Sequence, residues 1–302
     1  MKIGLALGSG ASRGWSHIGV INALAKIGIQ PDIICGTSIG SMVGASYAAN
    51  NLEKLESWAC SLSKFQTARF FDIGPAFNGF VDIEKLQLFL NEYVVSENTV
   101  IESFSKQYAA VATELLTGRE VWFTEGPVKD AILASLALPG LFPAISHNNK
   151  WLVDGGLVNP VPVSVCRALG ADIVIAVNLN GGIVGKHFHK PKAEKTATRH
   201  SGNGVVDTLS SMIKNYTDSI FTNTKSKNQP PGLFEAIAGS VNITQDRITR
   251  SRMAGDPPDI LLTPRLSHIG LLEFYRAQEA ITEGKQCVDR MLSQIDHVLD
   301  LN

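Results

Sequence analysis

The sequence predicts an α/β fold with a parallel central sheet. Two apolar runs, Ile3 to Leu7 and "PDIICG" (31–36), are each followed by a stretch with helical spacing within the first fifty residues. Both runs are continuously apolar, which is typical of strands buried on both faces of a parallel sheet. Two strand-helix units in succession indicate parallel strands joined by right-handed crossovers.

The first two helices follow these strands directly. In "GWSHIGVINALAKIG" (14–28), Ile18, Ile21 and Leu24 have helical spacing, and Gly28 is a suitable residue just past a helix end. "SIGSMVGASYAA" (38–49) is the second expected helix.

The later elements repeat the pattern up to about residue 180. Apolar runs predict strands at "YAAVATEL" (108–115) and "DIVIAVNL" (172–179), and helical spacing predicts helices at 81–94 and 128–138. The second of these helices is expected to end before Pro139, because proline disfavours helical geometry in the residue ahead of it.

From Gly181 the chain becomes polar and locally basic, which is typical of a surface loop. An amphipathic helix is expected at 205–221, another helix around Leu233 to Met253, a returning strand at 258–264 and one long helix at 270–299. The apolar face of the helix at 205–221 would either contact lipid or pack on the core. We therefore expect a catalytic core at 1–180, a mobile loop with a helical cap or lid at 181–258, and a strand and helix at 259–302 that complete the core.

Charge and composition narrow the class of protein. The 302 residues contain 27 Lys and Arg against 28 Asp and Glu, so a net charge of −1 offers no overall field for nucleic acid or an anionic membrane. The four cysteines stand far apart, without the spacing of a zinc site or a disulfide scaffold. No run reaches the length of a signal peptide's apolar region or of a membrane span. We expect a soluble, cytoplasmic protein without metal or cofactor and without a nucleic-acid partner.

A serine stands at the junction of the second strand and the second helix. Gly36-Thr37-Ser38-Ile39-Gly40 matches the pattern G-x-S-x-G in the strand-turn-helix context that this motif requires. Small neighbours permit a sharp turn that would expose the Ser38 hydroxyl as a nucleophile. The alternative is that Ser38 only caps the helix.

A glycine-rich turn, "GSGASRG" (8–14), ends the first strand and could bind the oxyanion of an acyl-transfer reaction through backbone N–H groups. The same glycines resemble a dinucleotide-binding fingerprint, which requires an acidic residue at the end of the second strand. That strand end holds Cys35 to Ser38 instead, and Trp15 stands where a phosphate-binding loop has lysine.

A serine nucleophile also needs a base. Asp154, in "WLVDGGLVNPVPV" (151–163), ends an apolar run and is followed by two glycines, which let other backbone approach closely. The alternative is that it only forms a turn. The sequence around the histidines considered as bases marks none of them: His17, His187, His189, His200 and His297.

Together, "GSGASRG", "GTSIG" and "DGG", in this order, resemble the patatin-like phospholipase family, and within it the bacterial RssA-like, NTE-related branch. "ASLALPGLFP" (134–143) supports the likeness, which is strong from Lys2 to Asn180 and weaker over 259–274. The resemblance implies a three-layer α/β/α patatin-like fold with a mostly parallel central sheet and a helical C-terminal extension. It also implies an acyl hydrolase with a Ser-Asp dyad and neither metal nor histidine base.

The resemblance assigns roles to particular residues. Ser38 would be the nucleophile and Asp154 the base, and Arg13 would anchor the glycine-rich turn or help to place an anionic head group. The oxyanion hole would be formed at Gly8, Ser9, Gly10 and Ala11, chiefly by the N–H groups of the last two. Supporting positions would be Gly14, Gly36, Gly40, Gly155 and Gly156.

The substrates that the resemblance implies are fatty-acyl esters such as lysophospholipids or phospholipids, with a candidate membrane contact through 186–221. The alternative is a regulatory or adaptor protein that keeps the fold but has little turnover. One departure favours it: family members often have three successive glycines where this chain has Ser9, Gly10 and Ala11. A Cβ at Ala11 would be unfavourable if that position needs a positive φ.

Catalysis by the dyad also sets a requirement on Asp154. An exposed aspartate, with a pKa near 3.9, would be a weak base, and burial that raises its pKa to ~6.5 would make it effective. We therefore expect Asp154 to be shielded from water.

Overall fold

The computed structural model describes residues 1–70, 83–182 and 233–300. Within these residues the strands form one eight-stranded sheet in the order β5-β6-β3-β2-β1-β7-β8, with β4 paired to β3. The strands are β1 (Ile3–Leu7), β2 (Ile33–Thr37), β3 (Gln107–Glu114), β4 (Glu120–Phe123), β5 (Ile145–His147), β6 (Lys150–Asp154), β7 (Ile173–Val177) and β8 (Ile260–Leu262).

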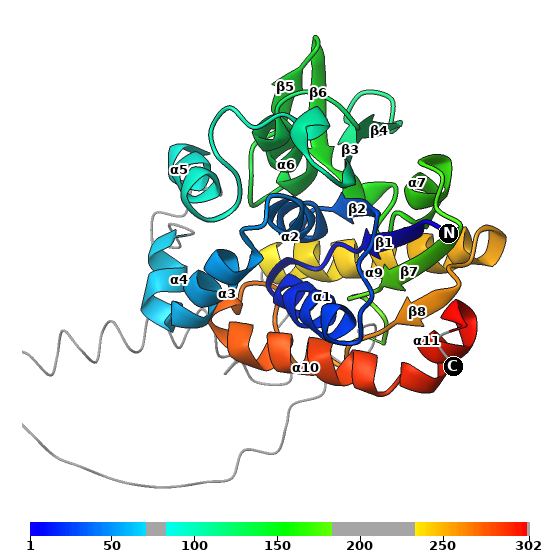
Figure 1. The fold of residues 1–302 in the computed structure, drawn as a ribbon. Helices are drawn as coiled ribbons and strands as arrows, with labels where there is room; N and C mark the ends of the chain where they lie inside the picture. Colours follow the sequence, from blue (N-terminus) through cyan, green and yellow to red (C-terminus); the bar gives the residue numbers. More distant parts are fainter. Residues whose placement is uncertain (71–82, 183–232, 301–302) are drawn as a thin grey trace, which may run out of the picture.

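The strand directions bring distant parts of the chain to one edge of the sheet. The pairs β1–β2, β2–β3, β1–β7 and β7–β8 are parallel, so the loops that follow β1, β2 and β7 leave from the same edge. Strand β6 is antiparallel to β3 and belongs to a hairpin that projects from the body of the protein (Figure 1). Thr37 pairs with Val111, and Asp154 pairs with the next residue of β3, Ala112. This register places Asp154 beside the end of β2.

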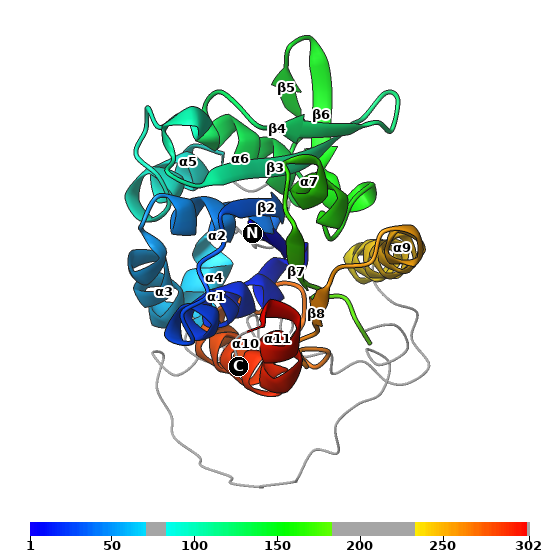
Figure 2. The same ribbon diagram turned by 45° about the vertical axis from the view of Figure 1, so that its right-hand side comes forward.

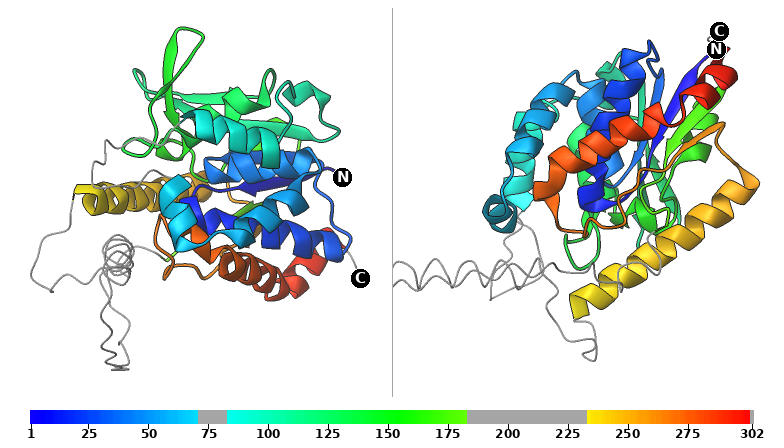
Figure 3. Two further views of the ribbon diagram at one scale, coloured as in Figure 1. Left: turned by 90° about the vertical axis from the view of Figure 1, so that its left-hand side faces the viewer. Right: turned by 90° about the horizontal axis from the view of Figure 1, so that it is seen from below.

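Helices cover both faces of the sheet (Figure 2). One face carries α1 (Ser16–Lys26), α2 (Ile39–Ala48), α6 (Val128–Leu136) and α10 (Ala277–Asp289), which share a buried apolar cluster with Leu5, Leu7 and Ile34. The other face carries α7 (Val163–Ala168) and α9 (Leu233–Gly255), over a second cluster that includes Ala6 and Val174. The views in Figure 3 show α9 running along the face opposite α1 and α10. The three-layer α/β/α fold and its mostly parallel sheet are thus confirmed.

Three further helices extend the layer of α2: α3 (Leu52–Ser61), α4 (Lys64–Phe70) and α5 (Ile83–Tyr93) (Figure 1). Short 3₁₀ turns occur at Ala11–Trp15 (η1), Ile101–Ser103 (η2), Gly155–Leu157 (η3) and Phe274–Arg276 (η4). No helix within the described ranges has both the length and the apolar character needed to cross a membrane.

The predicted single helix at 270–299 is wrong. The chain forms a loop and η4 before α10 begins at Ala277, and a break at Arg290 and Met291 separates α10 from α11 (Leu292–Leu299). The change of direction buries Ile295 and Leu299 in the same apolar cluster as β8. The amphipathic helix expected at 205–221 lies outside the described residues, and the division into three regions stays a prediction.

Candidate active site

Ser38 occupies a sharp turn between β2 and α2. Its φ of 56° and ψ of −126° are unusual for a residue with a side chain and indicate local strain. The turn depends on the flanking glycines: a Cβ at Gly36 would lie 2.4 Å from the Gly40 carbonyl oxygen, and one at Gly40 would lie 2.1 Å from the Leu7 carbonyl oxygen. The Ser38 hydroxyl makes no capping hydrogen bond to α2, so the helix-cap interpretation does not account for it.

The hydroxyl of Ser38 instead contacts Asp154. Ser38 Oγ donates a hydrogen bond to Asp154 Oδ2 at 2.5 Å, and the N–H of Gly156 donates one to Asp154 Oδ1 at 2.7 Å. Asp154 is only 1% exposed, which confirms that it is shielded from water. Burial raises the pKa of its carboxyl from 3.8 to about 6, although both hydrogen bonds act in the opposite direction.

Two residues that sequence reasoning missed hold this pair in place. Ser135, near the end of α6, accepts a hydrogen bond from the Ser38 N–H at 2.8 Å and donates one to the Val111 carbonyl at 2.6 Å. Thr113 donates its hydroxyl to the Asp154 carbonyl at 2.9 Å. Ser135 lies within "ASLALPGLFP" (134–143), so the motif contained a signal for it, whereas nothing in the sequence marks Thr113.

In the glycine-rich turn after β1, two of the four residues predicted to form an oxyanion hole have N–H groups that are already hydrogen-bonded. The N–H of Gly8 donates to the Val177 carbonyl at 3.1 Å, and the N–H of Ser9 donates to the Pro160 carbonyl at 2.8 Å. Their inclusion in the oxyanion hole is therefore corrected, because both donors are engaged. The N–H groups of Gly10 and Ala11 donate no hydrogen bond to any described residue. Ala11 has a φ of 47°, the left-handed conformation in which its Cβ is unfavourable.

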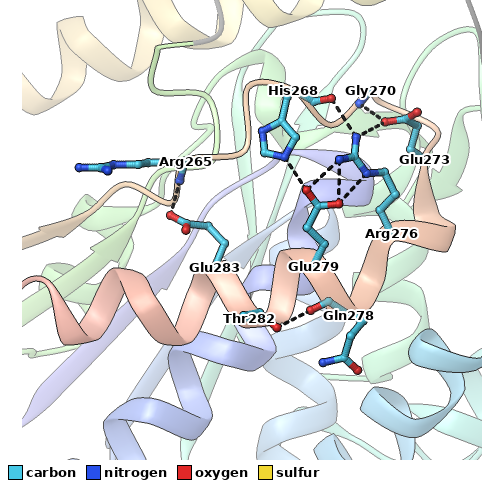
Figure 4. Close-up of polar contacts among 9 residues, drawn as sticks. All are labelled: Arg265, His268, Gly270, Glu273, Arg276, Gln278, Glu279, Thr282 and Glu283. Carbon is cyan, nitrogen blue, oxygen red and sulfur yellow. Dashed lines mark hydrogen bonds and ion pairs between the residues drawn. The ribbon is translucent and has the colours of Figure 1, made fainter. Parts of the chain in front are cut away.

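The far side of this turn rests on the loop before α10. Ser12 donates its hydroxyl to the Gly270 carbonyl at 2.7 Å and its N–H to the Leu271 carbonyl at 3.2 Å. Figure 4 shows the network that fixes this loop: His268 and Arg276 converge on Glu279 of α10. Arg276 also binds Glu273 and the His268 carbonyl, and the Gly270 N–H donates to Glu273.

No histidine in the described ranges hydrogen-bonds to Ser38 or Asp154. His17 is buried in α1, where its Nε2 lies 2.8 Å from the Gly8 carbonyl oxygen. Burial lowers the pKa of His17 to about 4, so it is neutral at physiological pH and acts as a packed core residue. His297 lies in α11, and His187, His189 and His200 fall outside the described residues.

An apolar pocket opens beside Ser38. Its described lining comes from α2 to α6, from the loop that follows α6, and from η1 and η4. Ser38 and Thr67 are the only hydroxyl-bearing side chains among the described residues that line it. The lining consists of Ala11, Trp15, Ser38, Ile39, Met42, Trp58, Leu62, Thr67, Leu86, Phe89, Leu136, Leu138, Leu141, Phe142 and Phe274. A pocket of this character suits a hydrocarbon chain whose carbonyl end lies at Ser38.

Comparisons with known proteins show what this chain is similar to. Residues 5–167 match the model of the family described as patatin-like phospholipase. An uncharacterized NTE family protein of Mycobacterium tuberculosis is 31% identical over 98% of this chain and 92% of its own length. The lysophospholipase NTE1 of Pyricularia oryzae is 29% identical over 94% of this chain and 18% of its own length. The crystal structure of VipD from Legionella pneumophila superimposes with a TM-score of 0.37 at 11% identity, covering 99% of this chain and 79% of that one.

Proposed function

Since this chain belongs to the patatin-like phospholipase family, we propose that it is a serine acyl hydrolase that cleaves fatty-acyl esters, of which lysophospholipids and phospholipids are the leading candidates. The observation that carries the proposal is the hydrogen bond from Ser38 Oγ to the buried carboxyl of Asp154, with Ser38 in the lining of an apolar pocket. A hydroxyl paired with a base is an activated nucleophile.

The proposed reaction has two steps. Asp154 accepts the proton of Ser38 as the hydroxyl oxygen attacks the ester carbonyl, and the N–H groups of Gly10 and Ala11 stabilise the oxyanion. The protonated Asp154 then donates its proton to the departing alcohol, which leaves an acyl group on Ser38. Water enters with Asp154 as base, and cleavage of this acyl-enzyme releases the fatty acid and restores the serine.

A phosphonylating probe tests the proposal directly. We expect a fluorophosphonate to add one phosphonyl group to the wild-type protein, seen as a single mass shift, because the activated serine displaces fluoride. The Ser38→Ala variant should show no adduct. A well-folded wild-type protein that remains unlabelled, under conditions that label a known serine hydrolase, would contradict the proposal.

The same measurement decides the second candidate, a regulatory or adaptor protein with little turnover. Ala11 favours this candidate, because its φ of 47° places a strained residue at one of the two available oxyanion donors. Loss of one such donor typically lowers kcat by about 10²- to 10³-fold. Slow turnover together with slow but complete labelling would indicate an enzyme with a weakened oxyanion hole, whereas absence of labelling would favour the adaptor.

The pH dependence of acylation should report the ionisation of Asp154. Only the carboxylate can accept the serine proton, so with a pKa of about 6 we expect kcat/KM to fall about tenfold per pH unit below pH 6 and to level off above it. A soluble p-nitrophenyl ester assayed from pH 4.5 to 8.5, with correction for its spontaneous hydrolysis, measures this fall in kcat/KM. A profile that stays nearly flat down to pH 4.5 would show that burial does not tune the base.

A further inference from the structure

Arg13 is a buried cation within the glycine-rich turn. It is 1% exposed, its Nε donates to the Gly10 carbonyl at 3.2 Å, and its Nη2 donates to Asn242 Oδ1 of α9 at 3.0 Å. Its third nitrogen, Nη1, is buried and has no hydrogen-bond partner among the described residues. Burial lowers the pKa of Arg13 to about 10, so the guanidinium still carries its charge at neutral pH.

No carboxylate neutralises this charge within the described part of the chain. The buried acid nearest in sequence to Asn242 on α9 is Asp246, one turn further on, and it pairs with Arg250 at 2.9 Å. The partner that α9 presents to Arg13 is therefore the neutral amide of Asn242. A buried charge without a counter-charge destabilises the folded protein, so the presence of Arg13 at this place needs a reason other than stability.

The hydrogen bond from Arg13 connects the charge to the proposed oxyanion hole. The Gly10 carbonyl that accepts it belongs to the same planar peptide unit as the N–H of Ala11. A cation at the carbonyl oxygen draws electron density through that peptide, and hydrogen bonds in series strengthen one another in this way. The Ala11 N–H thereby becomes a better donor, and its direction is fixed by the position of the carbonyl oxygen.

Helix α9 has other contacts that hold it against the turns. Gln245 accepts a hydrogen bond from Asn180 Nδ2 at 3.0 Å, and the same amide nitrogen lies 3.2 Å from the Ser9 carbonyl oxygen. Arg252 forms an ion pair with Glu120 at 2.7 Å. A change confined to the amide of Asn242 should therefore leave the helix in place.

We propose that Asn242 is a positioning residue that holds the guanidinium of Arg13 behind the Gly10–Ala11 peptide while leaving its positive charge uncompensated, so that the charge strengthens oxyanion binding. The proposal rests on the proposed acyl-hydrolase function. Two roles for Asn242 make different predictions. If Asn242 only anchors Arg13, a carboxylate would do this better, because it would also pair with the positive charge. If Asn242 preserves the charge of Arg13, the residue must be neutral.

The substitution Asn242→Asp separates these roles, because it retains the acceptor oxygen and adds a negative charge. We expect a new ion pair with Arg13 to raise Tm by about 2 to 4 °C. We expect the rate constant for phosphonylation of Ser38 to fall about tenfold, less than the ~10²- to 10³-fold cost of losing a whole donor. Both should be measured at pH 8.5, where Asp154 is ionised. Thr244→Asp, which places the same charge at an exposed position of α9, should change neither quantity.

Each outcome has a defined meaning. A raised Tm with an unchanged or faster phosphonylation rate would show that Asn242 is only an anchor and would overturn the proposal. A lowered Tm would show that Arg13 is already compensated and would overturn it too. Asn242→Ala provides a second test: loss of the acceptor should slow phosphonylation, and a wild-type rate in the folded variant would contradict a positioning role. If wild-type protein is not labelled at all, the proposed function itself fails, and this inference fails with it.

Discussion

Replacing Asp154 with asparagine is expected to slow phosphonylation of Ser38 by about 10²- to 10⁴-fold, which is the usual contribution of a general base. The hydroxyl proton now goes to a carboxylate 2.5 Å away, and an amide cannot accept it during attack. The amide can still fit the site, because its Oδ1 can accept from the Gly156 N–H while its Nδ2 donates to Ser38 Oγ. Intact-protein mass followed over time measures the rate.

The same variant should be more stable at neutral pH. A carboxyl whose pKa rises from 3.8 in the unfolded chain to about 6 in the fold contributes stability that is fully present below pH 3.8 and is lost as pH rises through 6. At about 1.36 kcal/mol for each pKa unit, ionisation at pH 8 costs about 3 kcal/mol. The amide that replaces the carboxyl does not ionise, so Asp154→Asn should melt at a higher temperature at pH 8, and the difference should disappear near pH 4.

The phosphonylation rate and the Tm of Asp154→Asn serve as controls for each other. Slower labelling together with a higher Tm is the signature of a base kept in its charged form at a cost in stability. An Asp154→Asn variant that labels as fast as wild type would show that another group accepts the proton. A variant that labels slowly but melts at a lower temperature at pH 8 would show that Asp154 supports the structure rather than the chemistry.

The elements that could be predicted from the sequence are those whose signals are local. Strand β1 and helix α1 follow from a continuous apolar run, helical spacing and the glycines that come after each element, and all of these signals act within about ten residues. The prediction of one helix over 270–299 was wrong because the break at Arg290 and Met291 contains neither glycine nor proline. It is set by the burial of Ile295 and Leu299, a tertiary effect that the helical pattern does not contain.

The residues of the candidate site also divide into those that a local motif marks and those that only long-range contacts place. Ser38 and Asp154 stand within short motifs, and the sequence pointed to both. Ser135 binds Ser38 across 97 residues and Asn242 binds Arg13 across 229, so no spacing rule connects them. The predicted oxyanion hole included Gly8 and Ser9 for a related reason. Their N–H groups donate to the carbonyls of Val177 and Pro160, which are remote in the chain, so the local sequence does not indicate that these donors are engaged.

Replacing Gly40 with alanine is expected to damage both the fold and the reactivity of Ser38. The added Cβ would lie 2.1 Å from the Leu7 carbonyl oxygen, 2.6 Å from the Leu7 carbonyl carbon and 2.9 Å from the Gly8 carbonyl oxygen. All three atoms are backbone at the start of the glycine-rich turn, so no side-chain rotation relieves the clash. Overpacking typically costs about 1 to 3 kcal/mol and sometimes more, and contact with rigid backbone places this variant at the upper end. Thermal melting measures the loss.

The loss of reactivity should exceed what unfolding explains. Relief of the clash must separate the start of α2, which carries Ser38, from the end of β1, which leads into the Gly10 and Ala11 donors. The distance between the proposed nucleophile and the proposed oxyanion hole would then change within the folded protein. We therefore expect slow phosphonylation of Gly40→Ala even at temperatures well below its Tm. Gly239→Ala in α9 is the matched control, because its Cβ has no neighbour within 4 Å and the substitution should add about 0.5 to 1 kcal/mol of stability without affecting labelling. Wild-type labelling by folded Gly40→Ala would mean that the strain is absorbed outside the site and that the close approach of α2 to β1 does not set the catalytic geometry.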